Sequence, residues 1–250
     1  MKMRKEISFI LLIIIIFMTG CTEDDGVCVS STGEITVKEW NTAPFQSVEV
    51  YDNINLILTQ DSVENGISIE AGENLIEGIT TELDSGKLVI KNQNRCDWLR
   101  SFKVPVNVYL TFTDLDTIIF RAAGNITCTN NWTNFAIHVD VIEGAGNIDL
   151  KLNTYRSYIL VRYGTVSVNL TGVSDVTTLI SYGFGPLHAE NLISEFTYVS
   201  CYSPNDMFVY SSIELAVEIG NIGNVYYRGN PTNITTNYLS EGRLYPLLAR

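Results

Sequence analysis

The pattern of hydrophobic and polar positions in residues 114–250 repeats at a nearly constant interval. Each repeat has a β-rich run, a glycine or in one case an asparagine, one small or polar residue, an apolar anchor residue and then alternating positions. The seven anchors are Ile126, Ile148, Val166, Leu187, Met207, Val225 and Leu244. Their separations are 22, 18, 21, 20, 18 and 19 residues. A period near twenty is typical of one coil of a β-solenoid.

The position two residues before each anchor predicts a sharp turn at the same place in every coil. Six of the seven repeats have glycine there, and the seventh has Asn205. Both residue types tolerate a left-handed backbone. Each anchor and the residue two positions later, such as Ile148 and Leu150, are mostly apolar. We therefore expect these two positions to face a shared core, with the residue between them facing outward.

An antiparallel sandwich is the competing architecture, because its hairpins can recur at a similar period. Asn-Gly and Asp-Gly, the usual hairpin turns, are absent from residues 114–250, which weighs against it. The fold class that we predict is all-β, a right-handed β-solenoid or β-helix-like stack.

Residues 35–113 are also rich in alternating segments, but they lack the regular glycine. Only Leu75, Ile76, Ile79 and Leu83 have a spacing that allows one or two helical turns. We predict one continuous domain over residues 35–250, in which 35–113 form an irregular β cap and 114–250 form regular coils. Such a cap would cover the end of the stack and prevent end-to-end pairing.

The first twenty residues have the pattern of an export signal. Positive residues open the chain, and an apolar run of ten follows from Phe9 to Met18, too short to span a bilayer. Met18-Thr19-Gly20-Cys21 resembles a bacterial lipobox, with Met18 where leucine is usual. We expect Cys21 to be lipidated and to be the contact with the membrane. An ordinary cysteine after another cleavage site, or an uncleaved anchor, are the alternatives.

Residues 21–34 form an acidic tether that bears on localisation. Thr22-Glu23-Asp24-Asp25 resembles the tract that directs some outer-membrane lipoproteins to the cell surface. A periplasm-facing lipoprotein with a solvated tether is the alternative. The whole chain has 16 basic and 28 acidic residues and a net charge of −12. A nucleic-acid partner is therefore not expected, since it requires a basic face.

Four further cysteines allow three pairings. Cys28 and Cys96 lie in polar, turn-like stretches and are the candidate disulfide, while Cys128 and Cys201 lie in apolar strand patterns and are expected to be buried thiols. No spacing of Cys or His indicates a metal site. We find no catalytic constellation and expect no cofactor, because GxSxG and GxxxxGK are absent and the histidines His138 and His188 fit strand surfaces.

Aromatic residues give the most direct indication of a binding face. Phe208 and Tyr210 follow the anchor Met207. Tyr226 and Tyr227 follow the next anchor, Val225. Rings stacked on one face of a solenoid could bind a glycan or a protein. The alternative is an aromatic ladder inside the stack.

Several segments carry a family resemblance. They are Phe45-Gln46-Ser47-Val48-Glu49-Val50, Ile69-Glu70-Ala71-Gly72-Glu73-Asn74-Leu75-Ile76, Leu83-Asp84-Ser85-Gly86-Lys87-Leu88-Val89-Ile90 and the later Gly-Asn-Ile units. In this order they resemble the auto-transporter adhesin, head GIN domain family over residues 35–250. The resemblance implies a β-helical lipoprotein domain of bacteria without an established activity.

Three hypotheses of function follow. The first is a lipid-anchored, surface-displayed binding or adhesion module for a glycan or protein. The second is a non-catalytic structural or envelope-stress lipoprotein. The third, a carbohydrate-active β-helix enzyme, would need two carboxylates about 5–9.5 Å apart in a groove.

Overall fold

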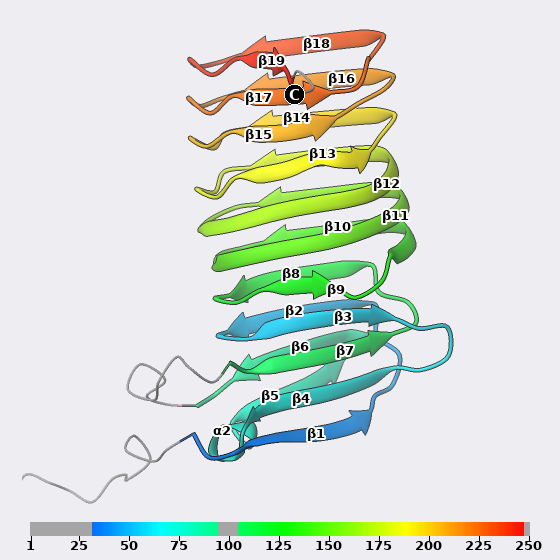
Figure 1. Ribbon diagram of the computed structural model, residues 1–250, viewed down its shortest axis with the longest axis vertical. Helices are drawn as coiled ribbons and strands as arrows, with labels where there is room; N and C mark the ends of the chain where they lie inside the picture. Colours follow the sequence, from blue (N-terminus) through cyan, green and yellow to red (C-terminus); the bar gives the residue numbers. More distant parts are fainter. Residues whose placement is uncertain (1–31, 95–104, 248–250) are drawn as a thin grey trace, which may run out of the picture.

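The computed structural model describes residues 32–94 and 105–247 and shows a tall stack of coils (Figure 1). It is nearly all strand, 65%, and forms a β-solenoid of about six turns. The predicted all-β solenoid is therefore confirmed, and the sandwich is not formed.

Nineteen strands and one short helix make up the described chain. They are β1 (Ile35–Asn41), β2 (Ser47–Asp52), β3 (Asn55–Gln60), β4 (Gly66–Gly72), α2 (Glu73–Ile76), β5 (Ile79–Asp84), β6 (Lys87–Asn92), β7 (Asn107–Phe112), β8 (Thr117–Ala122), β9 (Ile126–Cys128), β10 (Trp132–Val141), β11 (Ala145–Val161), β12 (Thr165–Ser181), β13 (Leu187–Ile193), β14 (Phe196–Cys201), β15 (Met207–Tyr210), β16 (Glu214–Ile219), β17 (Val225–Arg228), β18 (Asn233–Tyr238) and β19 (Leu244–Pro246).

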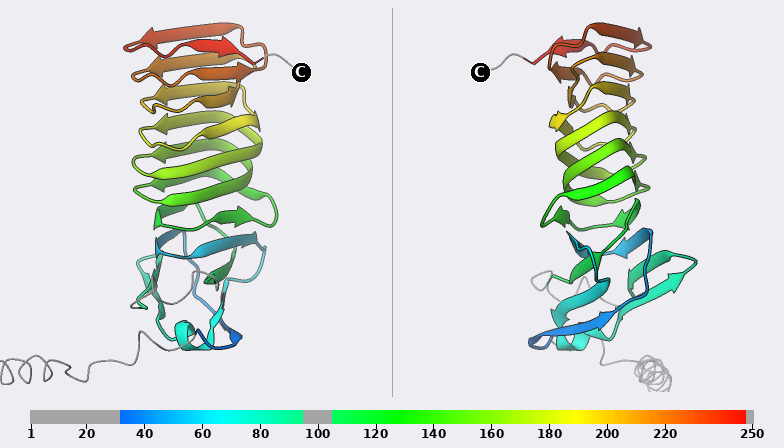
Figure 2. Two further views of the ribbon diagram at one scale, coloured as in Figure 1. Left: turned by 60° about the vertical axis from the view of Figure 1, so that its left-hand side comes forward. Right: turned by 90° about the vertical axis from the view of Figure 1, so that its right-hand side faces the viewer.

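The stacked strands form two walls around one core, and within each wall the strands run parallel (Figure 2). The first wall has the order β6, β2, β8, β10, the second halves of β11 and β12, β14, β16 and β18. The second has the order β7, β3, β9, the first halves of β11 and β12, β13, β15, β17 and β19. Because β11 and β12 pass through a corner, each belongs to both walls.

The predicted inward positions lie in the core. The anchors from Ile126 to Val225 are buried, and Leu244 packs against the core from the last coil. Residues two positions later, such as Leu150 and Val168, are also buried. The alternation predicted from the sequence is thus what divides inside from outside.

One anchor lies at a different register from the prediction. Ile148 pairs with Val168, whereas the predicted anchor Val166 pairs with Gly146. Val168 then pairs with Leu187, so the stacked position of this coil is Val168. Both valines are buried and both follow the two-residue period, so the sequence pattern could not distinguish them.

The reason for the repeated glycine also differs from the prediction. Among the six predicted turn glycines only Gly146 and Gly164 have positive φ, and Asn205 does not. A Cβ atom at Gly185 would instead overlap the carbonyl oxygen of Val166, and one at Gly124 would overlap that of Ile54. Glycine is therefore needed at this corner mainly because the backbones of successive coils approach each other closely.

The N-terminal part of the fold does not follow the order of the sequence. β2 lies between β6 and β8, and β3 lies between β7 and β9, so residues 47–60 form a coil of the parallel stack. Antiparallel pairs β1–β4, β4–β7 and β5–β6 lie at the end. The predicted helical turns are limited to α2, which buries Leu75 and Ile76, while Ile79 and Leu83 lie in β5.

Buried hydroxyl groups support the corner opposite the glycines. The Ser194 hydroxyl donates to the carbonyl oxygens of Phe196 and Asp175, at 3.1 and 3.3 Å. Ser211, one coil further, does the same with the carbonyl oxygens of Glu214 and Glu195. Each hydroxyl thus links its own turn to the coil below. Among the described residues, none forms a helix with the length and apolar character needed to cross a bilayer.

We predict that Gly185→Ala lowers the free energy of unfolding by about 1–3 kcal/mol, because the methyl group must displace the backbone of the coil below. The control is Gly66→Ala. A Cβ there would be 3.8 Å from the nearest atom, and we expect a change of about 0.5 kcal/mol or less. Urea unfolding followed by circular dichroism measures both, and equal stability of the two variants would contradict the close approach.

Candidate functional site

A column of stacked rings lies on the outer side of the second wall. His188 of β13, Phe208 of β15, Tyr226 of β17 and Tyr245 of β19 occupy one register in four successive coils. The ring centroids are 4.7 Å apart between His188 and Phe208, 5.2 Å between Phe208 and Tyr226, and 5.6 Å between Tyr226 and Tyr245. We call these four residues the aromatic column.

The predicted binding face is only partly this column. Phe208 and Tyr226 belong to it, and Tyr210 is also at an outward position, two residues after Phe208. Tyr227 lies two residues after the anchor Val225 and packs against the core, as the alternation predicts, so it is not part of the column. The prediction missed His188 and Tyr245, although both occupy the position after an anchor, Leu187 or Leu244. Asking which residue follows every anchor would have found them.

A groove lies on the first wall, beside the corner that β10 and β11 form at Phe135 and Tyr155. Its volume is about 620 Å³, and its lining includes Asp116, Phe135, Ala136, His138, Arg156 and Tyr158. Phe135 is 69% exposed and stacks on Tyr155 with centroids 5.1 Å apart. The register pairs Asn134 with Thr154 and Ala136 with Arg156, leaving Phe135 and Tyr155 outside the ladder at the corner. Sequence reasoning missed this site, because an exposed phenylalanine interrupts the alternation here.

The two described cysteines are buried free thiols, as predicted. Burial raises the pKa of the Cys128 thiol and of the Cys201 thiol to about 11 in each case. Cys21, Cys28 and Cys96 lie outside the described residues, so lipidation and the Cys28–Cys96 disulfide stay predictions.

The positions of the acidic side chains give little support for a metal site or for glycosidase catalysis. The described part of the chain holds no group of three or more His, Cys, Asp or Glu side chains placed for a metal ion. Three grooves in that part each include one carboxylate in their lining, namely Asp116, Glu39 and Glu218. None of these three brings together the paired acids of a glycosidase.

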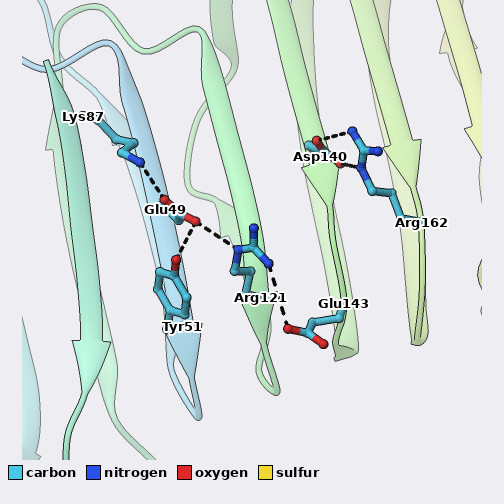
Figure 3. A network of polar contacts seen from close by, with 7 residues as sticks. All are labelled: Glu49, Tyr51, Lys87, Arg121, Asp140, Glu143 and Arg162. Atoms are coloured by element: carbon cyan, nitrogen blue, oxygen red, sulfur yellow. Dashed lines mark hydrogen bonds and ion pairs between the residues drawn. The ribbon is translucent and has the colours of Figure 1, made fainter. Parts of the chain in front are cut away.

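A charged cluster on the first wall joins coils that are distant in sequence (Figure 3). Glu49 of β2 accepts hydrogen bonds from Lys87 Nζ at 2.8 Å, Arg121 Nε at 3.0 Å and the Tyr51 hydroxyl at 2.7 Å. The Glu49 side chain is only 8% exposed. Burial by itself raises its pKa, but the hydrogen bonds from Lys87, Tyr51 and Arg121 outweigh burial and keep the pKa below the ordinary value. The cluster holds β6, β2 and β8 together.

A second ion pair continues the same wall. Arg162 donates from Nε and Nη2 to the two carboxylate oxygens of Asp140, at 2.8 and 2.9 Å. These charges are satisfied by one another across successive strands. They support the stack and leave the aromatic column and the groove as the candidate ligand sites.

The structure is thus an acidic β-solenoid with aromatic side chains on its outer walls. The chain belongs to the family described as "Putative auto-transporter adhesin, head GIN domain", whose model matches residues 44–231. The predicted family is thereby confirmed, and membership indicates a role in adhesion at the cell envelope or surface.

Solved structures share the fold. A "putative adhesin" from Bacteroides fragilis is 19% identical, has a TM-score of 0.79 and is matched over 86% of this chain and 97% of its own. A "putative lipid binding protein" from Parabacteroides distasonis is 14% identical, with a TM-score of 0.65 and coverage of 87% and 98%. A "putative adhesin" from Parabacteroides merdae is 12% identical, with a TM-score of 0.60 and coverage of 87% and 98%. No curated protein matches the chain.

We predict that Glu49→Gln lowers the free energy of unfolding at pH 7 by about 1–3 kcal/mol, because hydrogen bonds to a buried charged group are weakened. The folded-state pKa of Glu49 lies below its ordinary value of 4.5. Its contribution is therefore complete above pH 4.5 and is lost as the pH falls through the folded-state pKa.

The difference between the native protein and Glu49→Gln should accordingly shrink below pH 4.5 in urea unfolding measured across pH. Glu143→Gln is the matched control, since Glu143 is 64% exposed and lies 4.0 Å from the same Arg121. A pH-independent difference for Glu49→Gln, or an equal effect of Glu143→Gln, would show that the cluster contributes no charge-dependent stability.

Proposed function

We propose that this protein is a surface-displayed adhesion module, anchored in the outer membrane by lipid on Cys21 and binding its partner through the aromatic column. The sequence supports the anchor through the lipobox-like Met18-Thr19-Gly20-Cys21 and supports display through the acidic tract after it. Family membership supports adhesion. The aromatic column on the outer surface is the observation that carries the proposal.

The geometry of the column favours a protein over a glycan as the partner. Because neighbouring rings stack, His188, Phe208 and Tyr226 cover one another's faces and present mainly their edges to solvent. A sugar ring packs against the open face of an aromatic ring, whereas a row of ring edges and tyrosine hydroxyl groups suits the surface of a protein. Tyr245, 45% exposed, ends the row in the last coil.

Other residues beside the column add polar contacts for such a partner. Arg228 is exposed next to it, and its guanidinium donates to the side-chain oxygen of Asn191 at 3.4 Å. His188 Nδ1 lies 3.4 Å from Glu190 Oε1. A hydrophobic row with a polar border is the usual composition of a binding interface.

We expect Phe208→Ala/Tyr226→Ala to weaken binding at least tenfold, about 1.4 kcal/mol, because it removes two adjacent rings of the column. The measurement is binding of the purified mature chain to an array of immobilised extracellular-matrix proteins, with a glycan array beside it. The matched control is Tyr182→Ala/Tyr202→Ala, a stacked pair with centroids 4.9 Å apart outside the column. Equal binding by the two double variants would refute the role of the column.

Cys21→Ser tests the anchor. Without the thiol no acyl chain can be attached, so we expect the protein to move from the membrane fraction to the soluble fraction of the cells. Cys28→Ser is the control and should stay with the membrane. If Cys21→Ser also sediments with the membrane, the lipid anchor is wrong even if the column binds its partner.

A further inference from the structure

The groove on the first wall has a free aromatic face, that of Phe135. Phe135 is 69% exposed, although one of its faces lies on Tyr155. Phe135 lines the groove and Tyr155 does not. The other face of Phe135 is therefore available to a ligand, because no ring of the coil below continues the stack there.

Polar groups without partners border this aromatic face. Among the described residues, the carboxylate of Asp116 and the guanidinium of Arg156 make neither a side-chain hydrogen bond nor an ion pair. Arg156 instead lies over Tyr155, with Cζ 5.5 Å from the ring centroid. An aspartate accepts through two oxygens and an arginine donates through a planar fork, so the two can hold neighbouring hydroxyl groups of one ligand.

A histidine in the wall of the groove also lacks a partner. His138 stacks edge-on against Tyr158, with centroids 4.8 Å apart. Its Nε2 atom is out of solvent and has no hydrogen-bond partner. Buried polar atoms usually have a hydrogen-bond partner, as Glu49 and Asp140 of the same wall do, so an unpaired Nε2 is a polar atom that a ligand group in the groove can satisfy.

We infer that this groove is a binding site for a neutral pyranose ring of a glycan. The C–H face of such a ring packs on Phe135, and its hydroxyl groups reach Asp116 and Arg156. A groove of about 620 Å³ is within the usual range of small-ligand sites. One acid and one base at its border balance each other, while a net charge of −12 repels acidic sugars from the whole protein.

The site is separate from the aromatic column. The groove is formed by residues 116–158 on the first wall, whereas the column lies on the second wall in β13, β15, β17 and β19. β10 and β11 hold Phe135, His138 and Arg156, and Asp116 directly precedes β8, so strands position the groove without a ligand. Loss of binding at one site therefore leaves the other intact.

Saturation-transfer NMR of the full mature chain with methyl glycosides of neutral hexoses and N-acetylhexosamines tests the site, with glucuronic acid as the acidic comparison. We expect transfer to the ring C–H protons of at least one neutral sugar. Phe135→Ala should weaken binding at least tenfold, and Phe135→Trp should restore it. Phe184→Ala is the matched control, because Phe184 is 51% exposed and lies outside the groove lining.

Ala136→Trp provides a second test that does not remove a stacking ring. Ala136 is exposed in the groove, so a tryptophan there fills the groove without disturbing the core, and we expect it to abolish saturation transfer. The inference is overturned if no neutral sugar receives saturation, if glucuronic acid binds more tightly, or if Ala136→Trp binds as well as Phe184→Ala. None of these results affects the test of the aromatic column.

Discussion

The spacing of hydrogen-bonded parallel strands, about 4.7–4.9 Å, is the constraint on which the rest of this structure depends. It places equivalent residues of successive coils directly above one another, so each side chain meets its counterpart from the next coil. Aromatic rings at 4.7 and 5.2 Å in the column are a direct result. The same spacing leaves no room for a Cβ atom at Gly185, where two backbones approach at the corner.

The constraint also explains why the two candidate sites differ. Where the register is continuous, as from His188 to Tyr245, rings cover each other's faces and expose a row of edges. The register between β10 and β11 is also constant, but Phe135 has a ring as its counterpart on one side only, Tyr155, and keeps a free face. A binding module with both features can hold a protein surface and a sugar ring on different walls.

Much of the fold could be predicted from the chain alone. The twenty-residue period and the alternation around Ile148, Leu187 and Val225 predicted the solenoid and its core, because each coil must bury the same positions. The position of β2 between β6 and β8 could not be predicted, since Ser47 pairs with both Lys87 and Thr117 and no local pattern records such distant partners. Neither could the pairing of Ile148 with Val168, because a shift of two residues keeps the same face inward.

The sequence by itself determined which residues face the core and that the chain forms a repeating β stack, because side-chain alternation and coil length are local properties. It also marked Phe208 and Tyr226 as surface aromatics. Only the tertiary structure decided which rings stack into the column and that Phe135 stands beside Asp116, His138 and Arg156. These arrangements depend on the register between coils, which is set by backbone contacts between residues about twenty to seventy positions apart.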